Sequence, residues 1–166
     1  MSSLAVGALI GGLAVATAID LKSRRIPNAL TAAMAGVGLA LAITGTSGTS
    51  VAGSFAGFVL GFLLMLPGYR LGATGAGDVK LMAAVGAMVG PALVVTAFLF
   101  TAVAGGVLAV AVAARRNRLA ATVAQAGALV TAPGAAPQQI RTAGASHRFA
   151  YGPAIAAGSV LAVLLA

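Results

Sequence analysis

The sequence has no cysteine and no glutamate and only one histidine, so several catalytic chemistries are excluded at once. Thiol nucleophiles, disulfides and thiolate metal ligands all require cysteine, and one imidazole cannot build a zinc centre without acidic partners. Charge is also scarce, since charged residues make up 7% of the 166 positions, whereas soluble chains carry about a quarter. We therefore expect no thiol or zinc hydrolase, and no bound metal or cofactor.

Hydrophobic residues make up 60% of the chain, which leaves too little polar surface to cover a soluble domain. The apolar runs are long and bounded, so they predict helices rather than a low-complexity, disordered chain. The ten Lys and Arg residues give a net charge of +8, but they are scattered between apolar runs, and aromatic residues are sparse. This pattern predicts a protein of the lipid bilayer and argues against nucleic acid as a partner.

Six apolar runs follow one another, separated by polar turns, prolines or basic residues. They cover residues 4–19, 29–43, 51–66, 79–90, 92–114 and 149–166. At about 1.5 Å per residue, several are shorter than the roughly 30 Å hydrocarbon layer. The fourth run is the shortest, so we expect its boundary at Gly90-Pro91 to shift or its helix to be partly buried among the others.

These runs predict an all-α integral membrane protein, with residues 1–166 as a single domain of about six transmembrane helices. Residues 119–131 are a candidate for a further interfacial helix, and residues 119–147 are given no role. If the N-terminus lies outside, all ten basic residues fall at cytoplasmic ends, and the external turns carry no charge. This orientation places Asp20 and Asp78 at similar depth, at the cytoplasmic face.

Asp20 and Asp78 are the only acidic residues of the chain, and both lie where an apolar run meets a basic loop. An ionisable residue at the membrane boundary is a functional-site hypothesis by default. Two carboxylates that lie close together cannot both ionise cheaply, so one keeps a proton while the other acts as a base on water. Such a pair can hydrolyse a peptide bond without a metal or a covalent intermediate.

Other interpretations of the two aspartates stay open at this point. A helix cap or membrane anchor suits Asp78, because the helix dipole favours an anion at an N-terminus, but it does not suit Asp20 near a C-terminus. A small proton- or cation-coupled transporter would use both as relay or ion sites, although such sites are expected near the bilayer midplane. A scaffold for a secretion assembly would use them only as anchors.

Three motifs accompany the aspartates. Residues 75–81 read G-x-G-D-x-K-L, residues 20–28 read D-x-x-x-R-x-I-P-N, and residues 151–158 read Y-G-P-A-I-A-x-G. Together they resemble the type IV prepilin peptidases, bacterial members of the G-x-G-D membrane aspartyl proteases. The resemblance implies that Asp20 and Asp78 are the catalytic pair.

The same resemblance implies a substrate, a location and partners. The substrate is a prepilin or pseudopilin precursor whose cytoplasmic leader is removed, and the enzyme is a multi-pass protein of the bacterial inner membrane. Pilus assembly or secretion machinery is a further implied partner. Long members of the family carry paired Cys motifs in an N-terminal region and also methylate the product, whereas this sequence begins with its first span and has no Cys. We therefore expect cleavage without methylation, as in the short members that serve Flp-type or tight-adherence pili.

Gly75, Gly77 and Lys80 are candidate substrate-binding residues. Without a Cβ, the two glycines permit unusual dihedrals and the close approach of an extended substrate strand, although a plain glycine-rich turn is the alternative. Lys80 follows Asp78 by two positions and so does not face it on a helix, which leaves both substrate contact and membrane orientation open. Gly152-Pro153 is expected to shape the start of the last helix, without a chemical step.

Overall fold

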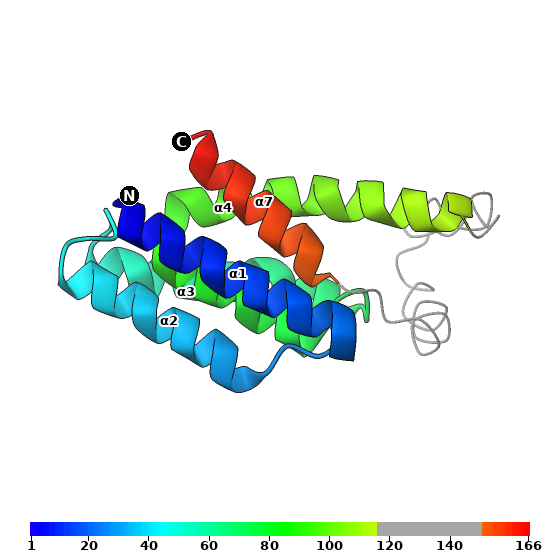
Figure 1. Cartoon of the computed structure of the whole chain (residues 1–166), viewed down its shortest axis with the longest axis horizontal. Helices are drawn as coiled ribbons and strands as arrows, with labels where there is room; N and C mark the ends of the chain where they lie inside the picture. Colours follow the sequence, from blue (N-terminus) through cyan, green and yellow to red (C-terminus); the bar gives the residue numbers. More distant parts are fainter. Residues whose placement is uncertain (116–150) are drawn as a thin grey trace.

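The computed structural model of the chain describes residues 1–115 and 151–166. The helices of these residues are α1 (Ser3–Ser23), α2 (Asn28–Ile43), α3 (Val51–Arg70), α4 (Ala76–Arg115) and α7 (Gly152–Leu164) (Figure 1). The expected all-helical architecture is therefore confirmed over the described residues. The candidate interfacial helix at residues 119–131, the rest of the segment 119–147 and the single histidine, His147, lie outside the described residues.

Serine caps begin two of the helices at positions where polar turns interrupt the sequence. The Ser2 hydroxyl accepts a hydrogen bond from the backbone N–H of Ala5 at 3.2 Å, and Ser50 accepts one from Gly53 at 3.0 Å. Each bond satisfies an N–H that has no partner within its helix, so it fixes where the helix starts.

The longest helix, α4, contains one residue with non-helical dihedrals, Gly90, at φ 82° and ψ 176°. Only glycine adopts this region readily. In a straight helix Asp78 and Gly105 would lie about 40 Å apart, but Tyr151 contacts Gly105 and is also close enough to Asp78 to feel its charge. The two halves of α4 therefore turn back on each other at Gly90 (Figure 1), where a boundary between two runs was predicted.

The first half of α4 forms the centre of the bundle. Every residue from 81 to 90 is buried, so the expected burial of the fourth run among the other helices is confirmed. On α3, a Cβ at Gly57 would overlap the carbonyl oxygen of Gly86, and one at Gly61 would lie 2.5 Å from the carbonyl oxygen of Met82. The Ser54 hydroxyl donates to the Ala87 carbonyl at 2.7 Å. Small residues therefore allow the backbones of α3 and α4 to approach closely, as is common in membranes.

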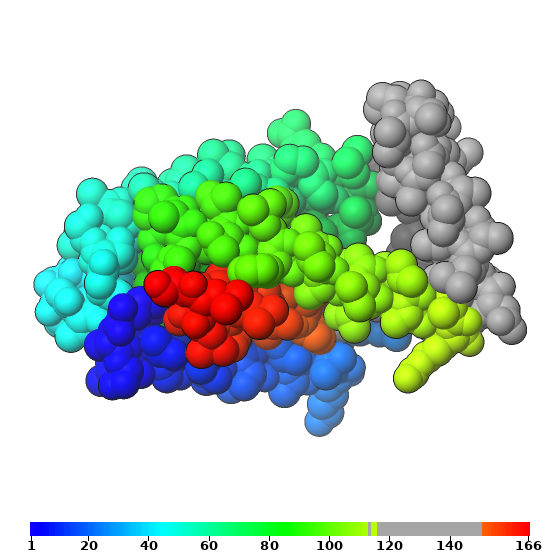
Figure 2. All heavy atoms as spheres, turned by 90° about the horizontal axis from the view of Figure 1, so that it is seen from above, coloured from blue at the N-terminus to red at the C-terminus, as the bar shows by residue number. Residues whose placement is uncertain are grey.

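The last helix, α7, lies between α1 and the second half of α4 (Figure 2). Its Ile155 joins Leu9 and Leu13 of α1 in the apolar core, while Gly158 packs against Thr101 of α4. This placement brings the start of α7 to the end of the bundle where α1 ends and α4 begins.

Three helices are long and apolar enough to cross a membrane, namely α1, α3 and α4 over Ala76–Val112. Large side chains such as Phe55, Leu99 and Val107 are exposed on the outer faces of α3 and α4, as expected where lipid replaces water. The α2 and α7 helices have 16 and 13 residues, or about 24 and 20 Å of length. The chain is thus a helical membrane protein, but helix length alone supports three spans and not the six that were predicted.

The close contact between α3 and α4 makes a testable prediction about stability. Gly86→Ala places a methyl group against the Gly57 carbonyl, so we expect overpacking to lower the free energy of unfolding by about 1–3 kcal/mol. The measurement is thermal unfolding in detergent micelles. Gly36→Ala is the matched control, because nothing lies within 4 Å of its added Cβ on the exposed face of α2. Equal stability of the two variants would contradict the described packing.

Candidate active site

Asp20 lies in the last turn of α1 and is 5% exposed. The helix ends shortly after it, because Arg24 adopts a left-handed conformation with φ 52° and donates its backbone N–H to the Asp20 carbonyl at 2.7 Å. A left-handed non-glycine residue costs roughly 1–2 kcal/mol. This turn reverses the chain and brings Ile26 back over the start of α4.

Asp78 lies in the first turn of α4 and is 7% exposed. Its Oδ2 accepts a hydrogen bond from the backbone N–H of Gly75 at 2.8 Å, which is the reciprocal bond of a capping box. The positive end of the helix dipole also favours a carboxylate here. Asp78 therefore caps α4, as the anchor interpretation expected, and this role is compatible with a second, chemical one.

The carboxylate of Asp20 has a similar partner, but from the far end of the chain. Its Oδ2 accepts the backbone N–H of Gly152 at 2.9 Å, across 132 positions of sequence. An anion near the C-terminus of α1 is unfavourable by itself, but this one also lies at the N-terminus of α7, whose dipole favours it. A Cβ at residue 152 would lie 2.8 Å from that oxygen, so the bond requires glycine.

The residue before Gly152, Tyr151, packs against α4. The ring of Tyr151 packs against Gly105 in the second half of α4. Burial raises the pKa of the Tyr151 phenol, and the negative charge of Asp78 raises it further. The start of α7 therefore holds the Asp20 carboxylate through Gly152 and packs against the second half of α4 through Tyr151.

The first two motifs are in direct contact. A Cβ at Gly77 would lie 3.1 Å from the Ile26 Cβ, and the Lys80 ammonium donates to the Asn28 side-chain oxygen at 2.8 Å. Gly75 faces Asp78, with 3.2 Å between its added Cβ and the carboxylate Oδ2. The space left by the missing Cβ atoms is therefore occupied by residues of the chain itself, by Ile26 at Gly77 and by Asp78 at Gly75.

Gly75 and Gly77 are not among the glycines with positive φ. Neither uses the unusual dihedrals that the absence of a Cβ allows. Lys80 is exposed, and its bond to Asn28 ties the start of α4 to the start of α2. The substrate-binding role of all three residues stays a prediction.

Sequence reasoning did not identify Tyr151, Ile26 or Asn28 as residues that make packing or hydrogen-bond contacts between helices here. All three lie inside the motifs that carried the resemblance, so the motifs were the available signal. The motifs could not predict which of their residues contact one another, because these contacts depend on how helices distant in sequence pack.

The electrostatics of this end of the bundle are one-sided. The two carboxylates are buried, while the basic side chains of the described residues are all exposed: Lys22, Arg24, Arg25, Arg70, Lys80 and Arg115. Over residues 1–115 and 151–166, no three His, Cys, Asp or Glu side chains lie together.

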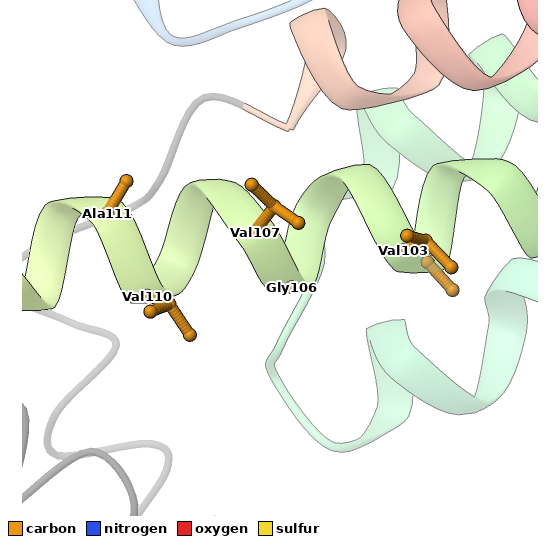
Figure 3. Close-up of a pocket in the computed structure, with 6 residues that line it drawn as sticks. Val103, Gly106, Val107, Val110 and Ala111 are labelled. Carbon is orange, nitrogen blue, oxygen red and sulfur yellow. The ribbon is translucent and has the colours of Figure 1, made fainter.

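A shallow hollow elsewhere on the surface offers no comparable chemistry. It lies along one face of the second half of α4 and is lined by small apolar residues (Figure 3), namely Ala102, Val103, Gly106, Val107, Val110 and Ala111. None of these side chains can bind or transfer a proton, so the aspartates define the candidate site.

The fold and the site together define a class, that of helical membrane proteins with two buried carboxylates held at one end of the bundle. Comparison with known families then identifies it further. The model of the type IV leader peptidase family matches residues 7–110, more than half of the chain, and this match includes both Asp20 and Asp78. The chain belongs to this family and is a protease of the prepilin leader peptidase type. Searches of curated proteins and of solved structures gave no match.

The bond between Gly152 and Asp20 makes a prediction about cleavage. Gly152→Ala would displace the Asp20 carboxylate, and a misplacement of about 1 Å can cost roughly 100-fold in rate. We expect a loss of that order in the cleavage of a prepilin by the purified protein. The control is Gly106→Ala, whose added Cβ meets nothing within 4 Å. A Gly152→Ala variant as active as this control would contradict the described site.

Proposed function

We propose that the chain is an aspartic endopeptidase that removes the cytoplasmic leader from type IV prepilin or pseudopilin precursors, with Asp20 and Asp78 as its catalytic pair. The observation that carries the proposal is that the only two carboxylate side chains of the sequence are both buried at one end of the bundle, where each accepts a backbone N–H at the N-terminus of a helix.

The chemistry follows from the two carboxyl groups. In the proposed mechanism one carboxyl group of the pair acts as the acid and the other as the base. The ionised carboxylate takes a proton from water, the water oxygen attacks the peptide carbonyl carbon, and the protonated carboxyl gives its proton to the carbonyl oxygen. Proton transfer to the leaving amine then breaks the C–N bond and restores the starting state.

The proposal places this site at the cytoplasmic face of the bacterial inner membrane. Lys22, Arg24 and Arg25 follow Asp20 directly, and Lys80 follows Asp78, as expected for a cytoplasmic end. With the chain reversed at Gly90, α4 contributes two crossings, which together with α1, α2, α3 and α7 makes six. Pilus assembly or secretion machinery is the proposed partner beyond the precursor, and Gly75, Gly77 and Lys80 are the proposed substrate contacts.

A transporter would use the same aspartates at a different depth. Asp20 is four residues from the C-terminal end of α1 counted inclusively, and Asp78 is the third residue of α4. A relay or ion site would be expected near the bilayer midplane. The position of both residues at helix ends therefore favours the peptidase.

We expect Asp20→Asn and Asp78→Asn each to abolish cleavage while leaving a folded, membrane-inserted protein. An amide can neither take a proton from water nor return one to the carbonyl oxygen. The assay is conversion of a purified prepilin to its shortened form in detergent. Lys22→Ala, two positions from Asp20 and exposed, is the control and should keep its activity. Substantial cleavage by either folded Asn variant would refute the aspartic mechanism.

The proposed topology can be tested with single cysteines, because the chain has none of its own. Cysteines at the exposed positions Thr46 and Ala92 should react with an impermeant maleimide added outside intact cells. Cysteines at the exposed positions Ser23 and Arg115 should react only after the membrane is opened. Labelling of Ala92 and Arg115 from the same side would show that α4 does not cross twice.

The proposal covers cleavage alone, since these 166 residues lack the paired Cys motifs of the methylating members. We expect mass spectrometry of the product, made with a methyl donor present, to show an unmodified N-terminus. A gain of one methyl mass catalysed by this purified chain would contradict that part of the proposal.

A further inference from the structure

The connection between α1 and α2 runs from the turn that carries one aspartate to the turn that carries the other. It leaves the last turn of α1, where Asp20 lies, and reverses at Arg24, which has a left-handed conformation and a 2.7 Å hydrogen bond to the Asp20 carbonyl. The Ser23 hydroxyl lies 2.8 Å from the Ile19 carbonyl oxygen and 3.1 Å from that of Arg25, and it can donate to either. The connection is therefore fixed where it leaves α1.

The same connection then packs against the first turn of α4. Ile26 is buried and belongs to the apolar core. A Cβ at Gly77 would lie 3.1 Å from the Ile26 Cβ and 3.4 Å from its backbone nitrogen, so the main chain and the side chain of Ile26 both lie against that turn. Two residues later, the Asn28 side-chain oxygen accepts a hydrogen bond from the Lys80 ammonium at 2.8 Å. The connection thus contacts α4 just before Asp78 and again two residues after it.

The two contacts differ in strength. Asn28 and Lys80 are both exposed, so water competes for each partner of their hydrogen bond and its net contribution is small. Ile26 is 7% exposed, and burial of its branched side chain favours the packed position of the connection. Ile26 is therefore the main contact that keeps the residues after Asp20 on the turn of Asp78.

We propose that Ile26 is a positioning residue of the active site, which sets the separation of the Asp20 and Asp78 carboxylates by holding the α1–α2 connection against Gly77. This inference rests on the proposed function. In this role Ile26 makes no contact with the substrate and transfers no proton. Acid and base groups must be held to within about 0.5 Å of the productive geometry, so loosening this contact should slow the chemical step and leave substrate binding almost unchanged.

The first test compares the cleavage kinetics of Ile26→Ala, Ile26→Val and Leu41→Ala. The alanine removes the buried, branched part of the side chain, whereas valine keeps the Cβ and Cγ1 atoms that lie nearest Gly77. Leu41 is the matched control, because it is 8% exposed and belongs to the same apolar core but lies in the last turn of α2.

We expect kcat for prepilin cleavage to fall by roughly 10- to 100-fold in Ile26→Ala, with KM within about twofold, because misplacement by about 1 Å can cost roughly 100-fold in rate. Ile26→Val should restore kcat to within about twofold of the unchanged protein, and Leu41→Ala should keep it. Thermal unfolding in the same detergent should show similar losses of stability in the two alanine variants, so that instability alone does not account for the difference in kcat.

The second test measures the positioning itself and does not depend on cleavage. Because the chain has no cysteine, nitroxide labels can be attached to single cysteines at the exposed positions Leu21, next to Asp20, and Ala76, two residues before Asp78. We expect the distribution of label distances measured by EPR to broaden in Ile26→Ala and to stay unchanged in Ile26→Val and Leu41→Ala.

The outcomes separate this inference from the proposed function. An unaltered distance distribution or kcat in Ile26→Ala, a rise in KM alone, or an equal loss of kcat in Leu41→Ala would overturn the positioning role. Cleavage by folded Asp20→Asn or Asp78→Asn would instead remove the proposed function. If Ile26→Ala does not fold, Ile26→Thr replaces it, since threonine has the shape of valine but puts a hydroxyl in the apolar core. Its kcat should fall below that of Ile26→Val, and equal values would overturn the inference.

Discussion

The hydrogen bond from Gly152 to Asp20 is the contact on which the arrangement of the site depends. An aspartate near the C-terminus of α1 faces an unfavourable helix dipole, and burial adds the cost of desolvation. The N-terminus of α7 offsets both with a backbone N–H at 2.9 Å and a dipole of the favourable sign. In turn the carboxylate helps to fix where α7 begins, and Tyr151 at that point packs against Gly105 of α4. The family match ends at residue 110, yet a residue beyond it completes the environment of one aspartate.

The close packing of the α3 and α4 backbones is the second feature on which the site depends. Because lipid supplies little hydrophobic force between helices, association in the bilayer depends on van der Waals contact and interhelical hydrogen bonds. Gly57 and Gly61 of α3 allow α4 to come within backbone contact, and Asp78 lies just before the fully buried stretch of α4 at residues 81–90. A rigid central helix of this kind limits how far the two carboxylates can separate.

Much of the fold could be predicted from the sequence because local signals determine it. Serine caps, prolines and basic clusters bound the helices, and the boundary expected at Gly90-Pro91 is the point where α4 reverses. The two aspartates were also predictable as candidate site residues, because they are the only acidic residues in a sequence with few charges. The number of membrane spans was harder to predict, because α2 and α7 are shorter than the hydrocarbon layer is thick and their burial depends on the neighbouring helices.

The partners of the aspartates could not be derived from local pattern. Nothing near Asp20 in sequence indicates that Gly152 holds it, since that bond requires α7, more than a hundred residues later, to pack along α1. Gly77 illustrates the same limit. Its motif position suggested space for a substrate strand, but Ile26 lies against it, because the left-handed turn at Arg24 returns the chain to that point.

The central claim is that Asp20 and Asp78 work as one unit, and a double-mutant comparison tests it most directly. If the two carboxyl groups act as one unit, either substitution alone removes their combined contribution to the cleavage rate. The second substitution should then lower the rate no further. We predict that the residual cleavage rate of the Asp20→Asn/Asp78→Asn protein, measured with the same prepilin and detergent, equals that of either single variant. Losses that add on a logarithmic scale, so that the double variant is slower by the product of the two single effects, would show two independent residues and contradict the account.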